Sequence, residues 1–210
     1  MQVSSAAVTG MMAAGQVDQS PPVAEAWRAA CEARIQICLA GRCAEARARR
    51  PDRDGWRRRM DDRERVANHE AGHIVGAVGV GRQQNGAVIE MVDHGCRGVA
   101  QHYQGAPPDL DHPTFDRFDE LQRDFVMATA FAKLVVGQRG WLPYLRTLWL
   151  RTDILLGQHW LCVKMLAMEL QRSGCVRRDR AQQIIDRWYR VPGTSLFEAL
   201  TRTLPQHHEE

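Results

Sequence analysis

The sequence predicts an α+β domain that is mostly α-helical, with one small β-hairpin sheet beside a central helix. Apolar residues recur at helical spacing over several long segments, which indicates amphipathic helices. Residues 86–105 instead alternate between apolar and polar around a central turn, as two paired strands do. A length of 210 residues with 44% hydrophobic residues suits one well-buried domain with an accessory arm.

Composition divides the chain into three parts. Residues 1–20 are rich in Ser, Ala, Gly and Gln, and we expect them to be disordered. Residues 21–60 predict a helical arm and a charged linker, with an amphipathic helix or helical pair over 23–49. Residues 61–205 are expected to form the main domain.

The first half of the main domain is predicted to contain two helices around a hairpin. Residues 62–80 predict the first helix. Residues 86–95 predict a strand that ends in a turn, and residues 98–105 predict its hairpin partner. After a loop rich in Pro and Asp, residues 115–136 predict a long helix.

The second half is predicted to be entirely helical. Glycine and proline within residues 140–143 predict a break in the chain direction. Thr152 is expected to cap a helix that runs to about Arg172. Two further helices are predicted over residues 178–190 and 194–204.

Charge gives only a weak indication of partners. The net charge of +3 is small for this length, so composition argues against nucleic acid as the main partner. Residues 47–65 are dense in both arginine and aspartate, which is typical of a solvated linker. The alternative for this segment is an arginine-rich contact for nucleic acid or an acidic partner.

Several features predict a cytoplasmic protein. No run approaches the roughly 20 apolar residues that span a bilayer, and the N-terminus lacks the basic and apolar regions of a signal peptide. The six cysteines form no CxxC pair, so a zinc site made of four cysteines is not expected. Reduced and partly buried thiols are the expected state.

The segment HEAGH at residues 69–73 is the strongest chemical signal in the chain. On a helix, His69 and His73 lie about 40° apart and one turn from each other, so both imidazoles can reach one ion. Neutral imidazole is a good zinc ligand. Glu70 lies on the adjoining flank, where it can take a proton from an attacking water. A helix with two surface histidines is the alternative interpretation.

HEAGH matches letter for letter the signature of the FtsH-family zinc peptidases, and residues 62–175 resemble their zincin-like domain. The predicted hairpin follows the motif helix as it does in that family. The later segment RTDILLGQHWL is similar to the family segment that carries a third zinc ligand. The resemblance therefore implies a Zn²⁺ site formed by His69, His73 and Asp153. It also implies that Glu70 is the catalytic base.

Other interpretations of these residues stay open. Asp153 is favourable near the start of a helix without any metal, because it faces the positive helix end. His159 is a rival ligand, although its apolar neighbours favour a core position or a place beside the ligands. His94 and His102 lie on the predicted hairpin, where they can flank a cleft or face solvent.

These observations lead to three hypotheses about function. The first is a zinc metallopeptidase that cleaves flexible or unfolded segments of a protein or peptide substrate. We expect it to act without ATP, because the chain has no GxxxxGK[ST] phosphate loop. The second is a catalytically silent zinc-binding relative that acts as an interaction or regulatory module. The third is a regulatory protease that clips repressors. A homo-oligomer is possible in each case.

The predicted hairpin has a use in the first hypothesis. An edge strand can hold an extended peptide through main-chain hydrogen bonds. Residues 98–103 or residues 88–92 are the candidate edge.

Overall fold

The computed structural model describes residues 21–50, 60–92, 95–102 and 120–189. It confirms a mostly helical α+β fold with one small antiparallel sheet. The helices are α2 (Pro21–Ala48), α3 (Asp62–Gly79), α4 (Glu120–Gln158), α5 (Trp160–Ser173) and α6 (Arg178–Trp188). The strands are β1 (Gln84–Val92), β2 (Gly95–His102) and β3 (Cys175–Arg177).

The sheet has the strand order β2-β1-β3. β1 and β2 form the predicted hairpin, in which Ile89 faces Gly98 and Glu90 faces Arg97. The short strand β3 was not predicted, and it pairs with β1 through Val176 opposite Ala87. β1 is therefore the central strand, and β2 is an edge strand within the part of the sheet that the structure describes.

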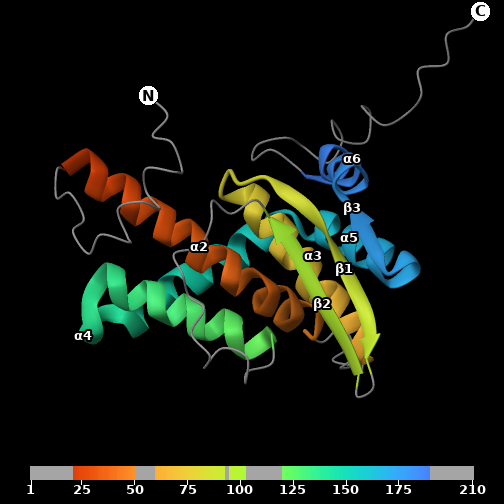
Figure 1. Cartoon of the computed structure of the whole chain (residues 1–210), viewed down its shortest axis with the longest axis horizontal. Coiled ribbons are helices and arrows are strands. Elements are labelled where there is room, and N and C mark those ends of the chain that lie inside the picture. The colour runs from red at the N-terminus through yellow and green to blue at the C-terminus, as the bar shows by residue number, and fades with distance from the viewer. Residues whose placement is uncertain (1–20, 51–59, 93–94, 103–119, 190–210) are drawn as a thin grey trace, which may run out of the picture.

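Helix α3 carries the HEAGH motif and lies in the middle of the molecule (Figure 1). Its N-terminus is capped by Asp61, whose side chain accepts a hydrogen bond of 2.7 Å from the backbone N–H of Glu64. Every residue from Val66 to Ala77 is buried. A helix that is buried on all sides is covered by other elements all round. Here the covering elements are helices α2 and α5 and strands β1 and β2, with a smaller contribution from α4.

Helix α2 is part of the same hydrophobic core and not a separate arm. Its residues Ile35, Leu39 and Ala44 are completely buried together with Ile74 and Val75 of α3. The helix predicted over residues 23–49 is present as α2, and the structure packs it into the core of the main domain. The expected disorder of residues 1–20 lies outside the described residues, as does much of the charged linker.

Helices α2 and α3 approach closely because both carry small residues at their contact. A Cβ atom added to Gly72 would lie only 2.6 Å from the carbonyl oxygen of Ala40. At Gly76 an added Cβ would meet the Ala40 side chain at the same distance. A glycine inside a helix costs about 1 kcal/mol relative to alanine. The close contact of the two backbones explains why glycine is present at these positions.

The breaks between the later helices differ from the predicted ones. Gly137, with φ 77° and ψ 176°, interrupts α4, whereas Pro143 lies inside the helix. The positive φ favours glycine at that position. Thr152 does not cap a helix, because its hydroxyl donates a 2.8 Å hydrogen bond to the Leu148 carbonyl within α4. The next helix begins only after His159.

The C-terminal part of the described chain follows the prediction. Helix α6 corresponds to the helix expected over residues 178–190. The helix predicted over residues 194–204 lies outside the described residues. The six cysteines are free, and four of them are buried. Among the described helices, none has a stretch of apolar residues long enough to cross a lipid bilayer.

Candidate metal centre

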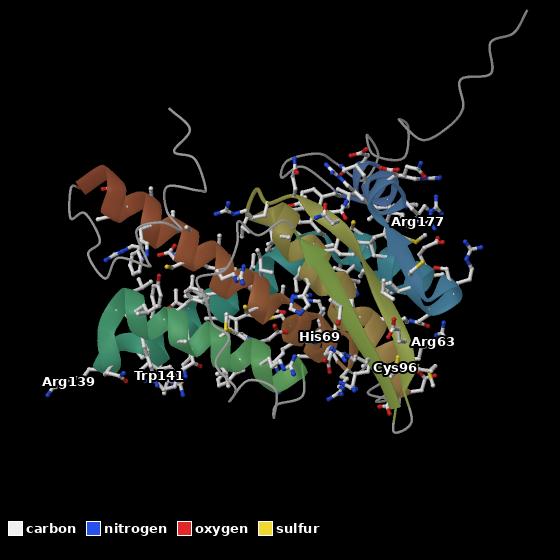
Figure 2. The ribbon with its side chains drawn as sticks, in the orientation of Figure 1. Arg63, His69, Cys96, Arg139, Trp141 and Arg177 are labelled. Carbon is white, nitrogen blue, oxygen red and sulfur yellow. The ribbon has the colours of Figure 1, made fainter. Side chains whose placement is uncertain are left out.

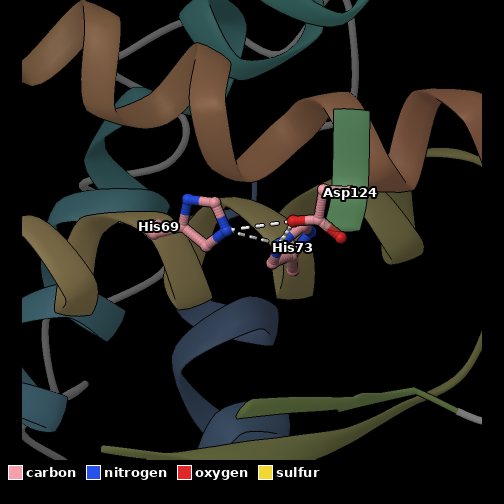
Figure 3. Close-up of side chains that lie close together, drawn as sticks. All are labelled: His69, His73 and Asp124. Atoms are coloured by element: carbon pink, nitrogen blue, oxygen red, sulfur yellow. Dashed lines mark hydrogen bonds and ion pairs between the residues drawn. The ribbon is translucent and has the colours of Figure 1, made fainter. Parts of the chain in front are cut away.

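Three potential metal ligands converge where α3 meets the start of α4. His69 and His73 project from α3, and Asp124 reaches toward them from α4 (Figure 3). The Nε2 atoms of the two histidines are 2.9 Å apart. Asp124 Oδ2 lies 3.1 Å from Nε2 of His69 and 2.9 Å from Nε2 of His73. The three atoms therefore form a nearly equilateral triangle.

The opposite side of each imidazole ring is held by helix α2. Nδ1 of His69 lies 2.8 Å from Glu45 Oε1, and Nδ1 of His73 lies 2.8 Å from the Ile37 carbonyl oxygen. A carboxylate and a carbonyl only accept hydrogen bonds, so each Nδ1 carries the proton and donates it. In its neutral form each ring then has an unprotonated Nε2, with its lone pair directed at the triangle. Metal-ligating histidines are oriented by such partners.

The three atoms of this arrangement are favourable neighbours only with a proton or a metal ion between them. Two imidazole lone pairs and one carboxylate oxygen are all acceptors, and at about 3 Å three acceptors repel one another unless a proton or a metal ion lies between them. His69 and His73 are buried, with exposed fractions of 3% and 7%. Water therefore does little to relieve the repulsion. The three residues could therefore hold a metal ion.

When no metal is bound, protons supply the positive charge. Burial alone would lower the pKa of His69, but hydrogen bonds to Asp124 and Glu45 outweigh it and raise the pKa to about 9. Burial also acts to lower the pKa of His73, and the charge of Asp124 overcomes it and raises that pKa. Burial would raise the pKa of Asp124, yet the two histidines hold it well below its usual range.

The size of the triangle suits a small divalent ion. Zinc binds histidine nitrogen and carboxylate oxygen at about 2.0–2.2 Å in tetrahedral sites, which separates the donor atoms by about 3.3 Å. The separations of 2.9–3.1 Å in this protein are only slightly shorter. Two histidines and one carboxylate are also a ligand set found in catalytic zinc sites. The residues therefore fit zinc in both number and chemistry.

Gly41 of α2 makes room for this centre. A Cβ atom added to Gly41 would lie 2.6 Å from Nε2 of His69 and 2.7 Å from Nε2 of His73. Such a side chain would occupy the side of the triangle that faces α2. The small residues along the α2–α3 contact therefore have two effects. They bring Glu45 and Ile37 within reach of the imidazoles, and they leave the Nε2 atoms unobstructed.

Glu70 lines the same cleft as the three candidate ligands. The cleft has a volume of about 190 Å³ and is bounded on its other side by Gly98, Val99 and Ala100 of β2. Glu70 is 3% exposed. A Cβ atom on Gly98 would lie 2.6 Å from Oε1 of Glu70, so glycine lets the edge strand approach this carboxylate closely. The structure thus brings His69, Glu70 and His73 together, as the motif predicted.

Asp153, the third ligand that the resemblance implied, is not part of this cluster, and Asp124 is the aspartate that lies beside the two histidines. The Asp153 carboxylate is bound by Arg47 at 3.1 Å and by Arg50 at 2.9 Å. It lies within α4 and not at a helix start, because the helix continues to Gln158. A Cβ atom added to Gly157 would lie 2.7 Å from Nη2 of Arg47, so glycine at this position leaves room for the Arg47 guanidinium.

The other candidate histidines do not join the cluster either. His159 is buried, as predicted, and its ring stacks on Tyr189 with a centroid separation of 3.7 Å. Burial lowers its pKa. His94 and the side chain of His102 lie outside what the structure describes.

Asp124 was missed by the motif-based reasoning, although the sequence holds a signal for it. It lies four residues before Ala128 and seven before Phe131, which are both buried. Residues at this spacing share one face of a helix. An acidic residue that continues the buried face of a helix needs a partner. The sequence alone does not identify that partner, which the structure shows to be the histidine pair of α3.

No known family model, curated protein or solved structure matches this chain. The description of the site therefore depends on its own geometry. That geometry defines a candidate metal centre of two histidines and one aspartate, with a glutamate in the same cleft.

Proposed function

We propose that this protein is a zinc-dependent metallopeptidase in which His69, His73 and Asp124 hold the ion. The observation that carries the proposal is the convergence of three acceptor atoms within 3.1 Å of one another. The rings that provide two of them are fixed from behind by Glu45 and the Ile37 carbonyl. Histidine rings that are held in this way are typical of metal-binding sites.

Glu70 is the proposed general base. Zinc at such a site supplies a Lewis acid that polarises a carbonyl and makes a water molecule more acidic. Glu70 shares the cleft with the ligands and follows His69 directly in the chain, so it is placed beside the ion without being a ligand. It takes the proton of the attacking water and then passes it to the leaving amine.

The edge strand β2 favours an extended peptide as the substrate. Gly98, Val99 and Ala100 form one wall of the cleft, and Val99 is 44% exposed. Main-chain groups on an edge strand can bind an extended peptide as an added strand, and β2 is at the edge of the part of the sheet that the structure describes. Of the two edges considered from the sequence, residues 98–103 are favoured, because β1 lies between β2 and β3.

The motif and its following hairpin also resemble the FtsH-type peptidases, which supports peptide bonds as the target. The third ligand departs from that resemblance, since Asp124 takes the place proposed for Asp153. Flexible or unfolded segments are the proposed substrates, because the narrow cleft of about 190 Å³ suits an extended chain.

The test is Glu70→Gln, measured for zinc content and for cleavage of a broad library of unstructured peptides. We expect the variant to keep about one zinc per chain and to lose cleavage by about 10²–10⁴-fold, the usual contribution of a general base. Unchanged turnover would remove Glu70 from the mechanism. Asn68→Ala on the same helix is a control for changes in helix stability alone, since Asn68 hydrogen-bonds only the Glu64 carbonyl among the described residues.

A catalytically silent zinc-binding module is the second candidate. The low exposure of His69 and Glu70, 3% each, favours it, because a substrate carbonyl must reach both groups. A folded wild-type protein that holds zinc but cleaves no peptide of the library would support this candidate and contradict the peptidase.

A further inference from the structure

A second cleft lies on the side of Glu45 that faces away from the histidines. Its volume is about 510 Å³. It is formed between α2, the start of α3 and α4, and its lining residues are Arg42, Glu45, Ala46, Arg49, Arg65 and Trp149. It thus brings Arg49 and Arg65 of the arginine-rich segment 47–65 together with Arg42, which precedes that segment in α2.

The cleft has an excess of positive charge. Three guanidinium groups and one carboxylate line it, which gives a net charge of +2. That carboxylate is already engaged, because Glu45 Oε1 accepts the 2.8 Å hydrogen bond from His69. Glu45 is therefore shared between the His69 imidazole and the guanidinium groups of this cleft.

The arginines are only loosely paired with acidic residues. Arg49 Nη2 lies 3.4 Å from Glu45 Oε2, and Arg65 Nη1 lies 3.8 Å from Glu45 Oε1. Arg65 also lies 3.6 Å from Asp62. Close pairs between guanidinium and carboxylate have separations of about 2.7–2.9 Å. Each of these contacts is longer, so both arginines retain the capacity to bind a further anion.

Arg42 has no carboxylate partner among the described residues. Its guanidinium carbon lies 5.8 Å from the centre of the Phe125 ring, which is a cation–π contact. The indole of Trp149 adds an aromatic surface on the α4 side. Arg47 and Arg50 of the same helical segment differ sharply, because Asp153 binds them at 3.1 Å and 2.9 Å. The arginine-rich segment is therefore divided into paired arginines and arginines that face the cleft.

We propose that this cleft binds the phosphate group of a small ligand, with Arg42, Arg49 and Arg65 as the anion-binding residues. A phosphate dianion matches the net charge of +2, and its oxygens point in several directions, so it can contact guanidinium groups from different helices. A carboxylate has one charge and two oxygens in one plane, which suits a single guanidinium better. Trp149 provides a surface for the uncharged remainder of the ligand. This binding does not depend on zinc or on peptidase activity.

The experiment is isothermal titration of the full chain with inorganic phosphate and pyrophosphate at fixed ionic strength. Glutarate is the matched dicarboxylate. The variants are Arg42→Gln and Arg49→Gln, and Arg139→Gln is the control, since Arg139 is exposed and lies at the far end of the molecule from His69 (Figure 2). We expect saturable binding of phosphate that weakens about tenfold or more in each of the two cleft variants and stays unchanged in the control.

Three results would overturn the proposal. They are no saturable phosphate binding to the wild-type protein, an equal loss of binding in Arg139→Gln, and tighter binding of glutarate than of phosphate. The side chain of Arg49 is 57% exposed, so Arg49→Gln is expected to fold even if Arg42→Gln does not. Titrations with and without bound zinc keep the two proposals separate, because phosphate binding is expected in both.

Discussion

Helix α4 presents an aspartate to the rest of the core near each of its ends, and the two aspartates have opposite surroundings. Near the first end, Asp124 faces the imidazoles of His69 and His73, which carry no permanent charge. Near the second end, Asp153 faces the guanidinium groups of Arg47 and Arg50, which are always charged. Both carboxylates are largely shielded, with side-chain exposures of 24% and 19%.

The difference shows how to separate a candidate ligand from a structural ion pair. The charge of Asp153 is already balanced by two arginines, so a metal ion there would be repelled by them. The side-chain nitrogens within 3.1 Å of Asp124 belong to the two imidazoles, which are charged only when they are protonated. The partners of a buried acid, more than its place in a motif, therefore indicate whether it binds a metal.

The largest expected effect on zinc affinity comes from replacing Asp124, with the same change at Asp153 as the comparison. We expect Asp124→Asn to weaken zinc binding by more than about 100-fold, because loss of a ligand exceeds the 10–100-fold cost of losing a residue that only orients one. Asp153→Asn should leave zinc affinity unchanged. Zinc content after dialysis, followed by competition with a chelator, measures both variants. Loss of zinc in Asp153→Asn with retention in Asp124→Asn would reverse the assignment and restore the sequence-based prediction.

A methyl group on α2 should obstruct the metal centre with no change in any ligand. In Gly41→Ala the added Cβ would lie 2.6 Å from Nε2 of His69, which is shorter than a normal contact. We expect zinc affinity to fall by about 10-fold or more, because the ligands or α2 must move. Gly140→Ala is the matched control, since its Cβ would make an ordinary 3.5 Å contact with Val136. Equal zinc affinity in both variants would show that α2 does not limit the site.

Replacing Glu45, whose carboxylate contacts Nδ1 of His69, should have an intermediate effect on zinc affinity. Glu45→Gln keeps the shape of the side chain but removes the negative charge of the carboxylate that accepts the hydrogen bond from Nδ1 of His69. We expect zinc affinity to fall by about 10–100-fold, the usual effect of losing a partner that orients a metal ligand. Chelator competition gives the value. An affinity equal to that of the wild-type protein would mean that the Ile37 carbonyl and helix packing alone orient the rings.

The ion pairs of Asp153 with Arg47 and Arg50 should affect the stability of the fold and leave zinc affinity unchanged. Asp153→Asn leaves the half-buried Arg47 without its carboxylate, and we expect a loss of about 1–2 kcal/mol in the free energy of unfolding. Arg50 is more exposed, at 55%, so Arg50→Gln should cost less than about 1 kcal/mol. Urea unfolding of the zinc-loaded protein measures both. A larger cost for Arg50→Gln than for Asp153→Asn would contradict this order.

Much of the fold was predictable because its signals are local. The periodicity of residues 62–80 and the alternation over residues 86–105 predicted α3 and the β1–β2 hairpin. The break in α4 was misplaced because Gly137, Gly140 and Pro143 are all plausible breaking points, and the sequence alone does not rank them. β3 was missed because three residues are too few to show alternation.

The sequence by itself determined half of the candidate site. A spacing of four residues on a helix places the side chains of His69 and His73 on one face, and Glu70 follows as their neighbour. Only the tertiary structure decided the rest. Asp124, Glu45 and Ile37 reach the histidines from 24 to 55 residues away in the chain. Their approach depends on how closely α2 and α4 pack against α3. That packing is a property of the whole core, so no local pattern could choose Asp124 over Asp153.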